Sequence, residues 1–174
     1  MKKKQKVDIG ISLSLIFISI IILILPLFNF NNVSFLTFIL YLLYTIIGTI
    51  KFFLIKDSKD YEGLHIVLSS IIPLIITVII KPETPRQIAL ILGIWLILMS
   101  ITKLKKIDYY HDRHDRMWKV RTFILGLFIL TGILSSVNLA FANEFQIVIF
   151  GFLTLIHGIL ELFDPILKTL INHA

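Results

Sequence analysis

Cysteine is absent from this chain of 174 residues, and charged residues make up only 16% of it. The lack of cysteine excludes disulfides, thiolate metal sites and a cysteine nucleophile. The sequence also has no glycine-rich phosphate loop, no serine or threonine next to a plausible base, and no pair of acids spaced for intramembrane proteolysis. We therefore expect a protein that is not an enzyme, without cofactors or catalytic residues.

Apolar residues dominate instead: 57% of the chain is hydrophobic and its mean hydropathy is +0.92. A soluble domain is usually about half apolar and about a quarter charged. A bilayer core about 30 Å thick needs roughly 20 apolar residues per helix. The sequence therefore predicts an all-α polytopic membrane protein, a single domain over residues 1–174. Its six expected helices span residues 9–28, 34–55, 64–80, 86–104, 120–142 and 145–163.

Two segments need comment. The basic start "MKKKQK" and the apolar run after it resemble a signal peptide, but residues 9–28 exceed the roughly 7–15 residues of its apolar region. We expect a retained first helix. The third helix contains Pro73. Because neighbouring helices can satisfy the backbone group that proline leaves free, we expect a kink and not a break.

The basic residues lie almost entirely on one side of the predicted spans. Only Lys81 and Arg86 fall on the other side. The remaining fifteen are Lys2, Lys3, Lys4, Lys6, Lys51, Lys56, Lys59, Lys103, Lys105, Lys106, Arg113, Arg116, Lys119, Arg121 and Lys168. The positive-inside rule then places both termini on the cytoplasmic side of a cell membrane. The net charge is +6, and because these charges flank the apolar spans, they indicate contacts with anionic lipid headgroups and not with nucleic acid.

The helices contain small residues at repeated positions. Their alignment predicts three copies of a two-helix hairpin, with a pseudo-threefold axis as one arrangement. The aligned sets are Gly48, Ser100 and Gly158; Tyr41, Gly93 and Gly151; Ser14, Ser70 and Gly126; and Pro26, Pro82 and Asn138. Small residues let membrane helices approach closely, which predicts helix packing at Gly48, Gly93, Ser100, Gly126, Gly132, Gly151 and Gly158. A pore-lining role and association into homo-oligomers or with a membrane partner stay open.

The stretch "IHGILELFDPIL" holds the main candidate for a polar site inside the membrane, His157 with Glu161. In the repeat, Glu161 aligns with Lys51 and approximately with Lys103, which predicts an interfacial charge paired with one of them. His157 lies one turn deeper on the same helical face. Ionisable residues in membrane helices are often functional, and histidine titrates near physiological pH. The alternative is a histidine hydrogen-bonded to a neighbouring helix. Pro165 is expected to end the helix.

The predicted cytoplasmic loop "DYYHDRHDR" is rich in histidine and aspartate. Its candidate residues are Asp108, His111, Asp112, His114 and Asp115. Imidazole and carboxylate groups can gather a divalent cation, but arginines between them oppose one. We therefore expect a solvated, salt-bridged loop without bound metal, whose histidines could sense acidification. Trp118, Tyr109 and Tyr110 beside it are expected as interfacial anchors, and Trp95 as a packing residue.

Two stretches carry a resemblance to a known family: "MWKVRTFILGLFILTGIL" (117–134), with Trp118 before Gly126 and Gly132, and "FGFLTLIHGILELF" (150–163). With "LGIWLILMSI", they resemble the HdeD-like acid-resistance membrane proteins over nearly the whole chain. The resemblance implies a six-helix inner-membrane protein associated in some bacteria with survival of acid stress, without catalytic residues. The chain departs from the family in Ser100, where a glycine is usual, and in its His- and Asp-rich loop.

Three functions follow as expectations. The first is a non-enzymatic membrane protein of the acid-stress kind. The second is a small proton- or solute-linked transporter or channel that uses His157 and Glu161. A water-accessible cavity that reaches His157 would support it. The third, an intramembrane enzyme, would need a second polar cluster facing His157, and the other helices offer only Ser, Thr, Asn and Tyr there.

Overall fold

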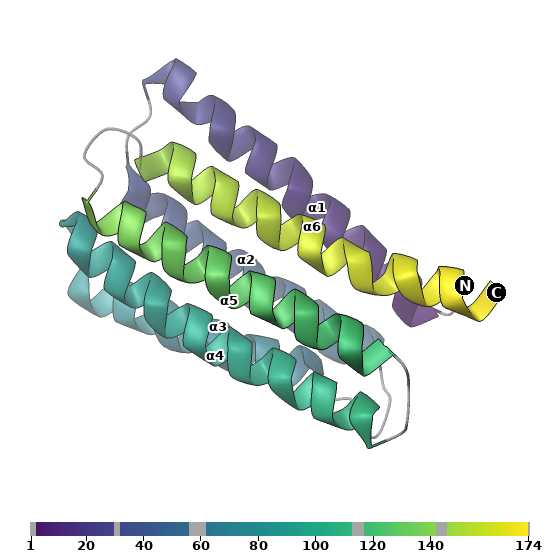
Figure 1. The fold of residues 1–174 in the computed structure, drawn as a ribbon. Helices are drawn as coiled ribbons and strands as arrows, with labels where there is room; N and C mark the ends of the chain where they lie inside the picture. The colour runs from purple at the N-terminus through teal and green to yellow at the C-terminus, as the bar shows by residue number, and fades with distance from the viewer. Residues whose placement is uncertain (1–2, 30–31, 56–61, 113–116, 142–145, 174) are drawn as a thin grey trace.

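The computed structural model describes residues 3–29, 32–55, 62–112, 117–141 and 146–173. Within these ranges the regular structure is entirely helical (Figure 1). The elements are α1 (Lys3–Ile24), the 3₁₀ turn η1 (Leu25–Phe28), α2 (Val33–Leu54), α3 (Glu62–Ile80), α4 (Pro85–His111), α5 (Met117–Phe141) and α6 (Gln146–His173). All six α-helices belong to spans long and apolar enough to cross a membrane. The predicted all-α polytopic fold with six spans is confirmed.

The helix starts follow from local sequence. Asn32 accepts a hydrogen bond from the Phe35 N–H and so caps α2. Thr84 and Gln87 form a capping box at the start of α4, with proline in the first turn, where its missing N–H costs nothing. α3 runs unbroken through Pro73, which confirms that the proline does not break the helix, and the kink stays a prediction.

Three helices depart from their predicted boundaries. The first was expected over residues 9–28, but α1 begins at Lys3 and gives way to the 3₁₀ turn η1 after Ile24. α4 was expected to end at residue 104 but continues to His111, because Ile107 and Tyr110 extend its buried face by another turn and a half. The first part of the predicted loop is therefore helix. α6 was expected to end at Pro165 but continues to His173. Proline lacks only its own N–H, and the buried Pro165 lies on the packed side of a helix that remains apolar beyond it.

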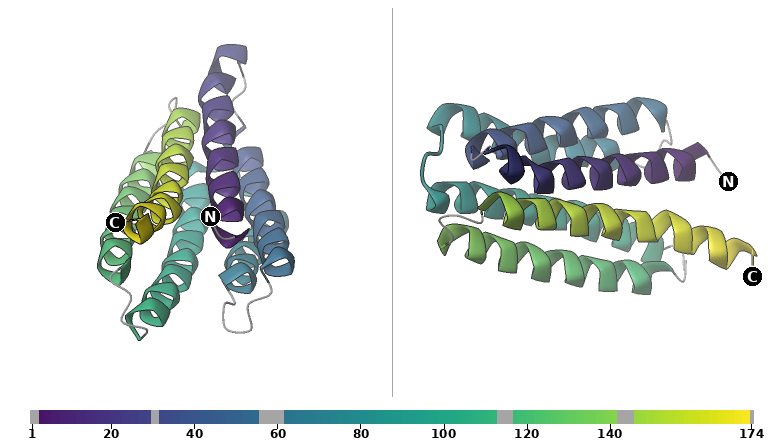
Figure 2. Two further views of the ribbon diagram at one scale, coloured as in Figure 1. Left: turned by 90° about the vertical axis from the view of Figure 1, so that its right-hand side faces the viewer. Right: turned by 90° about the horizontal axis from the view of Figure 1, so that it is seen from above.

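The helices do not pack in the order that the predicted hairpins suggest. The closest pairs are α1 with α6, α2 with α3, and α4 with α5, followed by α3 with α4 and α5 with α6. Figures 1 and 2 show α1 lying along α6, so that both chain ends emerge at the same end of the bundle. The first predicted hairpin is thus opened in favour of a contact between the first and last helices. The threefold repeat stays a prediction.

Glycines mark the closest helix contacts. A Cβ atom added at Gly48 would lie 2.9 Å from the Val67 backbone nitrogen, in the contact of α2 with α3. Added at Gly151 or Gly158, it would meet side chains of α1 at 2.7 and 3.0 Å. At Gly132 it would meet Leu96 of α4 at 2.7 Å. These four glycines therefore lie where two helices approach closely.

Gly93, Gly126 and Ser100 behave differently. A Cβ atom added at Gly93 or Gly126 would meet nothing within 4 Å among the described residues, so neither glycine lies at a close helix contact there, and their packing role stays a prediction. Ser100 is partly buried and donates to the backbone oxygen of Leu96 in its own helix. Gly93 and Ser100 instead line an apolar groove of 530 Å³ between α4 and α5.

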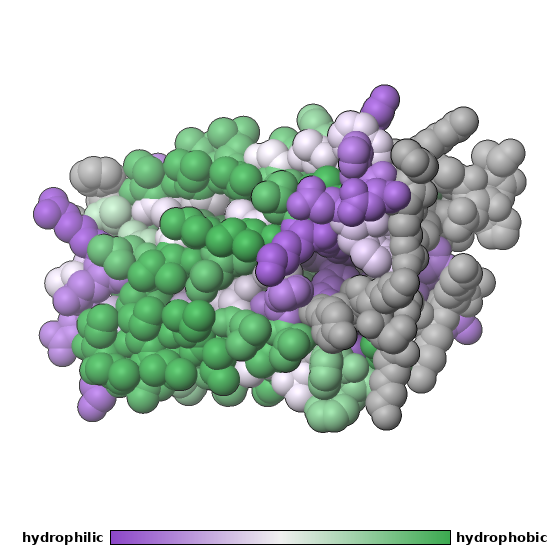
Figure 3. All heavy atoms as spheres, turned by 90° about the horizontal axis from the view of Figure 1, so that it is seen from below, coloured by the Kyte–Doolittle hydropathy of each residue, from purple (hydrophilic) through white to green (hydrophobic). Residues whose placement is uncertain are grey.

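Polar groups collect at the two ends of the bundle. Figure 3 shows one face, on which apolar side chains form a broad field and hydrophilic ones gather toward the ends. We call the end with Asp8, Lys51, Glu62, Lys103 and Glu161 the charged end. The opposite end, with Asn32, Lys81, Glu83 and Gln146, is the far end.

Candidate functional site

His157 is enclosed by aromatic rings from three other helices. Its side chain is only 2% exposed. The ring centroids of Tyr44 on α2, Trp95 on α4 and Phe128 on α5 lie 5.3, 5.7 and 4.8 Å from that of the imidazole. Four helices therefore meet at this histidine. Trp95, which was expected to be a packing residue, packs directly against its ring.

The hydrogen-bonding capacity of the His157 ring nitrogens is unused within the described residues. Among the described residues, neither ring nitrogen has a hydrogen-bond partner. The nearest carboxylate is Glu161, whose Oε1 lies 3.8 Å from Nε2, beyond hydrogen-bonding distance. The predicted alternative, a histidine hydrogen-bonded to a neighbouring helix, is therefore wrong. A buried polar group without a partner costs about 1–3 kcal/mol, so packing alone does not explain a histidine here.

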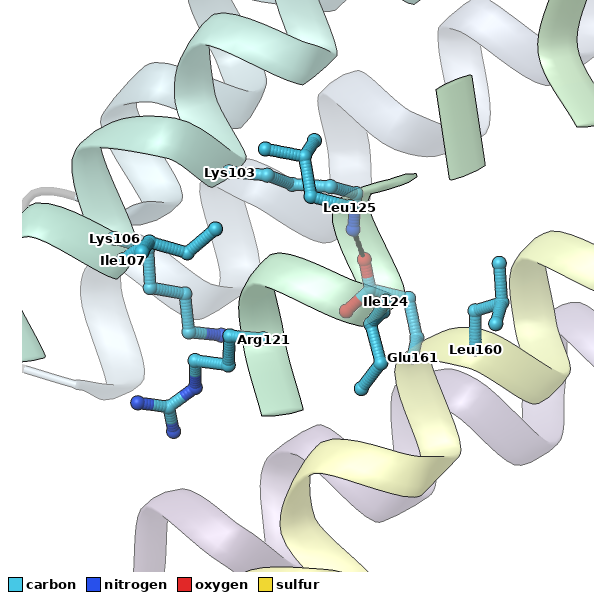
Figure 4. A pocket seen from close by; sticks show the side chains of 8 residues that line it. All are labelled: Lys103, Lys106, Ile107, Arg121, Ile124, Leu125, Leu160 and Glu161. Atoms are coloured by element: carbon cyan, nitrogen blue, oxygen red, sulfur yellow. Dashed lines mark hydrogen bonds and ion pairs between the residues drawn. The ribbon is translucent and has the colours of Figure 1, made fainter. Parts of the chain in front are cut away.

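Glu161 pairs with Lys103, which extends from α4 toward α6 (Figure 4). This is one of the two partners that the repeat predicted, and it is confirmed. The Lys103 Nζ also lies 5.1 Å from the centroid of the Phe128 ring, the same ring that contacts His157. Lys103, Glu161 and His157 thus form one connected group, which we call the histidine centre.

A second group of charges joins the other helices at the same end. The Nζ of Lys51 on α2 lies 2.8 Å from Asp8 Oδ1 on α1 and 3.0 Å from Glu62 Oε2 on α3. Glu62 also accepts from Lys106 on α4, at 2.6 Å. Lys51 therefore has carboxylate partners other than Glu161. Because Lys106 is one turn from Lys103, α4 connects this group to the histidine centre.

The sequence prediction missed Asp8, Glu62, Lys106 and Arg121 as members of the site. A usable signal existed: Asp8 and Glu62 are acids in or next to the first turns of odd spans, on the side where even spans end in lysine. Opposite charges at the same membrane depth favour pairing, since an unpaired charge there is costly.

A small cavity opens beside the histidine centre, between α4, α5 and α6. Its volume is 30 Å³, enough for a water-sized occupant. Its lining consists of Lys103, Lys106, Ile107, Arg121, Ile124, Leu125, Leu160 and Glu161 (Figure 4). The Arg121 guanidinium is buried and stacks on the Tyr110 ring, 3.4 Å from its centroid. The cavity reaches Glu161, and His157 lies one turn deeper, outside the lining.

A larger cavity of 590 Å³ lies at the far end, lined by the starts of α2 and α6 and the α3–α4 connection. Tyr41 and Tyr44 lie on α2 between this cavity and Lys51. Tyr41 and Trp95 are fully enclosed, and in the described part of the chain the Tyr41 hydroxyl and the Trp95 indole N–H lack hydrogen-bond partners. Buried polar atoms are therefore present not only at His157 but also between His157 and the far end.

The predicted histidine loop does not assemble a metal site within the residues that the structure describes. His111 and Asp112 are both exposed, and their closest charged atoms are 3.9 Å apart. The His111 ring contacts Trp118, with centroids 5.0 Å apart. His114 and Asp115 lie outside the described residues.

The fold defines an all-α multi-pass membrane protein, and its site is a buried histidine next to an ion pair. No family model, no curated protein and no solved structure matches the chain. The resemblance to the HdeD-like proteins therefore stays a prediction.

Proposed function

We propose that this protein is a non-enzymatic membrane protein that responds to acid by taking up a proton at His157. One observation carries the proposal: a fully enclosed imidazole has no hydrogen-bond partner among the described residues and lies beside the Glu161–Lys103 ion pair. Histidine is the side chain suited to change charge in the range where cells meet acid.

Burial and the nearby Lys103 oppose a positive charge on His157, and Glu161 favours one. Glu161 lies on the same helix, 3.8 Å away, and the imidazolium would attract it in competition with Lys103. The rings of Tyr44, Trp95 and Phe128 surround the imidazole in edge-on and tilted contacts and exclude other groups from it. Protonation would therefore loosen the bond between α4 and α6 and strengthen contacts within α6.

We also propose an orientation of the protein in the membrane. With basic residues concentrated at the charged end, the positive-inside rule places that end in the cytoplasm and both termini with it. The histidine centre then monitors the cytoplasmic side of a cell membrane, where Lys105 and Lys119 face anionic headgroups. The resemblance to HdeD-like proteins supports a role in surviving acid stress.

The test is survival of bacteria after an acid challenge, with and without the expressed protein. His157→Phe keeps an aromatic ring in the site but removes the titratable group, and His111→Gln is the control at an exposed histidine. At matched abundance, the wild type and His111→Gln should protect, and His157→Phe should not. Equal protection by all three would refute the role of His157. If the wild type gives no protection, the acid-stress role is wrong.

A second candidate is a proton-linked transporter of small solutes. Cavities at both ends of the same helices favour it, but His157 lines neither of them. Reconstitution into liposomes with a pH gradient tests it, since a transporter should dissipate the gradient in the presence of its solute. His157→Phe should abolish that flux. A gradient that persists for every small cation, anion and amino acid offered would exclude this candidate.

A further inference from the structure

The apolar groove between α4 and α5 is a defined hollow on the outside of the bundle. Its volume of 530 Å³ lies in the range of about 300–1,000 Å³ that is typical of ligand pockets. Ile97, Ser100 and Leu104 form its α4 side, and Ile129 and Ile133 lie on its α5 side. The exposed fractions of Ile97 and Ile133 are 63% and 56%. In a single copy of the chain, the groove is therefore open to the membrane.

Two glycines border this groove without a close contact of their own. Gly93 lines it on α4, and Gly126 lies on the same side of α5, three and seven residues before Ile129 and Ile133. A Cβ atom added at either glycine would meet nothing within 4 Å among the described residues. Glycine weakens a helix relative to alanine. Contacts within the described part of one chain therefore do not explain why both helices carry glycine here.

The small residues favour a helix over a lipid as the occupant of the groove. An acyl chain is flexible and adapts to a rough surface, whereas the backbone of a helix comes close only where side chains are small. Gly93 and Ser100 are seven residues apart, the spacing that keeps residues facing a nearly parallel helix. The spans of a neighbouring membrane protein run in about that direction. The groove is therefore suited to a membrane helix.

Charges at the rim of the groove indicate which helix this is. The His111 ring on α4 contacts the Trp118 ring on α5, with centroids 5.0 Å apart, so Asp112 and Lys119 lie at a similar depth. Both of these side chains are exposed, and no ion pair joins them among the described residues. α4 thus brings a negative charge to the rim and α5 a positive one, which is the pattern of a surface that can pair with itself.

We propose that a second copy of this chain fills the groove, in a dimer with a twofold axis along the membrane normal. Both copies have the same orientation in the membrane, so the axis sets α4 of one copy opposite α5 of the other. Asp112 of each copy then faces Lys119 of the other, and the lysine exchanges a lipid headgroup for a carboxylate. The half-exposed Ile133 and Val137 on each α5 enter the groove of the other copy. The proposal does not depend on the proton site, because His157 lies on α6 in the bundle interior.

Co-purification of two tagged forms tests the dimer. The forms carry different affinity tags, are expressed together in bacteria, and are purified by one tag in mild detergent; the second form should be retained. Gly93→Leu fills the groove and should lower the retained fraction about tenfold. Gly10→Leu is the matched control: it makes the same change at an exposed position of α1 where a Cβ also meets nothing within 4 Å, and it should retain the second form.

Detergent can separate membrane dimers, so a second measurement uses intact membranes. The chain has no native cysteine. Oxidation of Ile133→Cys should give a disulfide-linked dimer. Ile75→Cys on α3, at a position that is 50% exposed, should stay monomeric.

The rim charges are tested by reversal. Lys119→Glu should weaken the dimer about fivefold, because an exposed ion pair contributes little and two like charges then meet. Adding Asp112→Lys to the same chain restores the pair with its signs exchanged and should restore retention. His157→Phe should leave retention unchanged, whether or not it abolishes protection against acid.

Three results would overturn the proposal. The first is a wild type that retains no second copy, together with no disulfide-linked dimer of Ile133→Cys in intact membranes. The second is a dimer that persists undiminished in Gly93→Leu. The third is a monomer that carries a phospholipid in native mass spectrometry, lost in Gly93→Leu and kept in Gly10→Leu, which would assign the groove to lipid.

Discussion

Replacing Gly48 by alanine should measure how closely α2 and α3 must approach. The new Cβ atom would lie 2.9 Å from the backbone nitrogen of Val67 and 3.0 Å from the backbone oxygen of Gly63. Backbone atoms cannot rotate away, so the two helices must separate, at a cost of about 1–3 kcal/mol. Alanine returns about 0.5–1 kcal/mol through its better helix propensity. The net loss is therefore about 1 kcal/mol, the centre of a range of about 0–2.5 kcal/mol.

For a chain of this length, each kcal/mol corresponds to about 2–4 °C in melting temperature. Thermal unfolding in detergent, followed by tryptophan fluorescence, should therefore show Gly48→Ala melting about 2–4 °C below the wild type. Gly93→Ala is the matched control: it makes the same change within a membrane helix where a Cβ meets nothing within 4 Å, and should melt at or above the wild type. If Gly48→Ala melts as high as Gly93→Ala, the close contact of α2 with α3 is wrong.

Three shorter predictions concern other contacts. Lys103→Met leaves Glu161 without its partner and should cost about 3–5 kcal/mol in unfolding free energy, much of it restored by adding Glu161→Gln. Cysteines at Leu15 and Gly158 should form an intramolecular disulfide on oxidation, since the Leu15 Cβ lies 3.3 Å from a Cβ built at Gly158; gel mobility reads it without interference from native cysteine. Ser69→Ala breaks a 2.8 Å hydrogen bond from α3 to α4 and should lower the melting temperature by about 2–4 °C.

The sequence was sufficient for the number and type of helices, because a bilayer requires runs of apolar residues that composition alone reveals. It was less reliable at helix ends. Residues 105–111 read as loop because of their charges, yet Ile107 and Tyr110 keep α4 packed there. Packing partners were hardest to predict. The spacing of glycines indicates which face of a helix allows close contact, but it does not indicate which neighbouring helix packs there. Gly93 and Gly126 have such spacing and no neighbour.

The candidate site was half predicted. Helical periodicity places His157 and Glu161 on one face, and the charge of Lys103 at the same membrane depth indicates its pairing. The aromatic enclosure could not be found in the same way. Tyr44, Trp95 and Phe128 come from three different helices, and no local pattern shows that their rings converge on one imidazole. That requires the helix arrangement itself.

The contact of α1 with α6 has a consequence for how this protein is made. Helices α2 to α5 each pack against a neighbour in sequence and can do so as they leave the ribosome. Among these six helices α1 emerges first, but its main partner is the last of the six to be synthesised. During that interval the α1 surface that covers Gly151 and Gly158 has only lipid or a membrane insertion factor to contact. Biosynthesis of the whole bundle is therefore completed only by the final span, and chains truncated before Gln146 should leave α1 open to degradation.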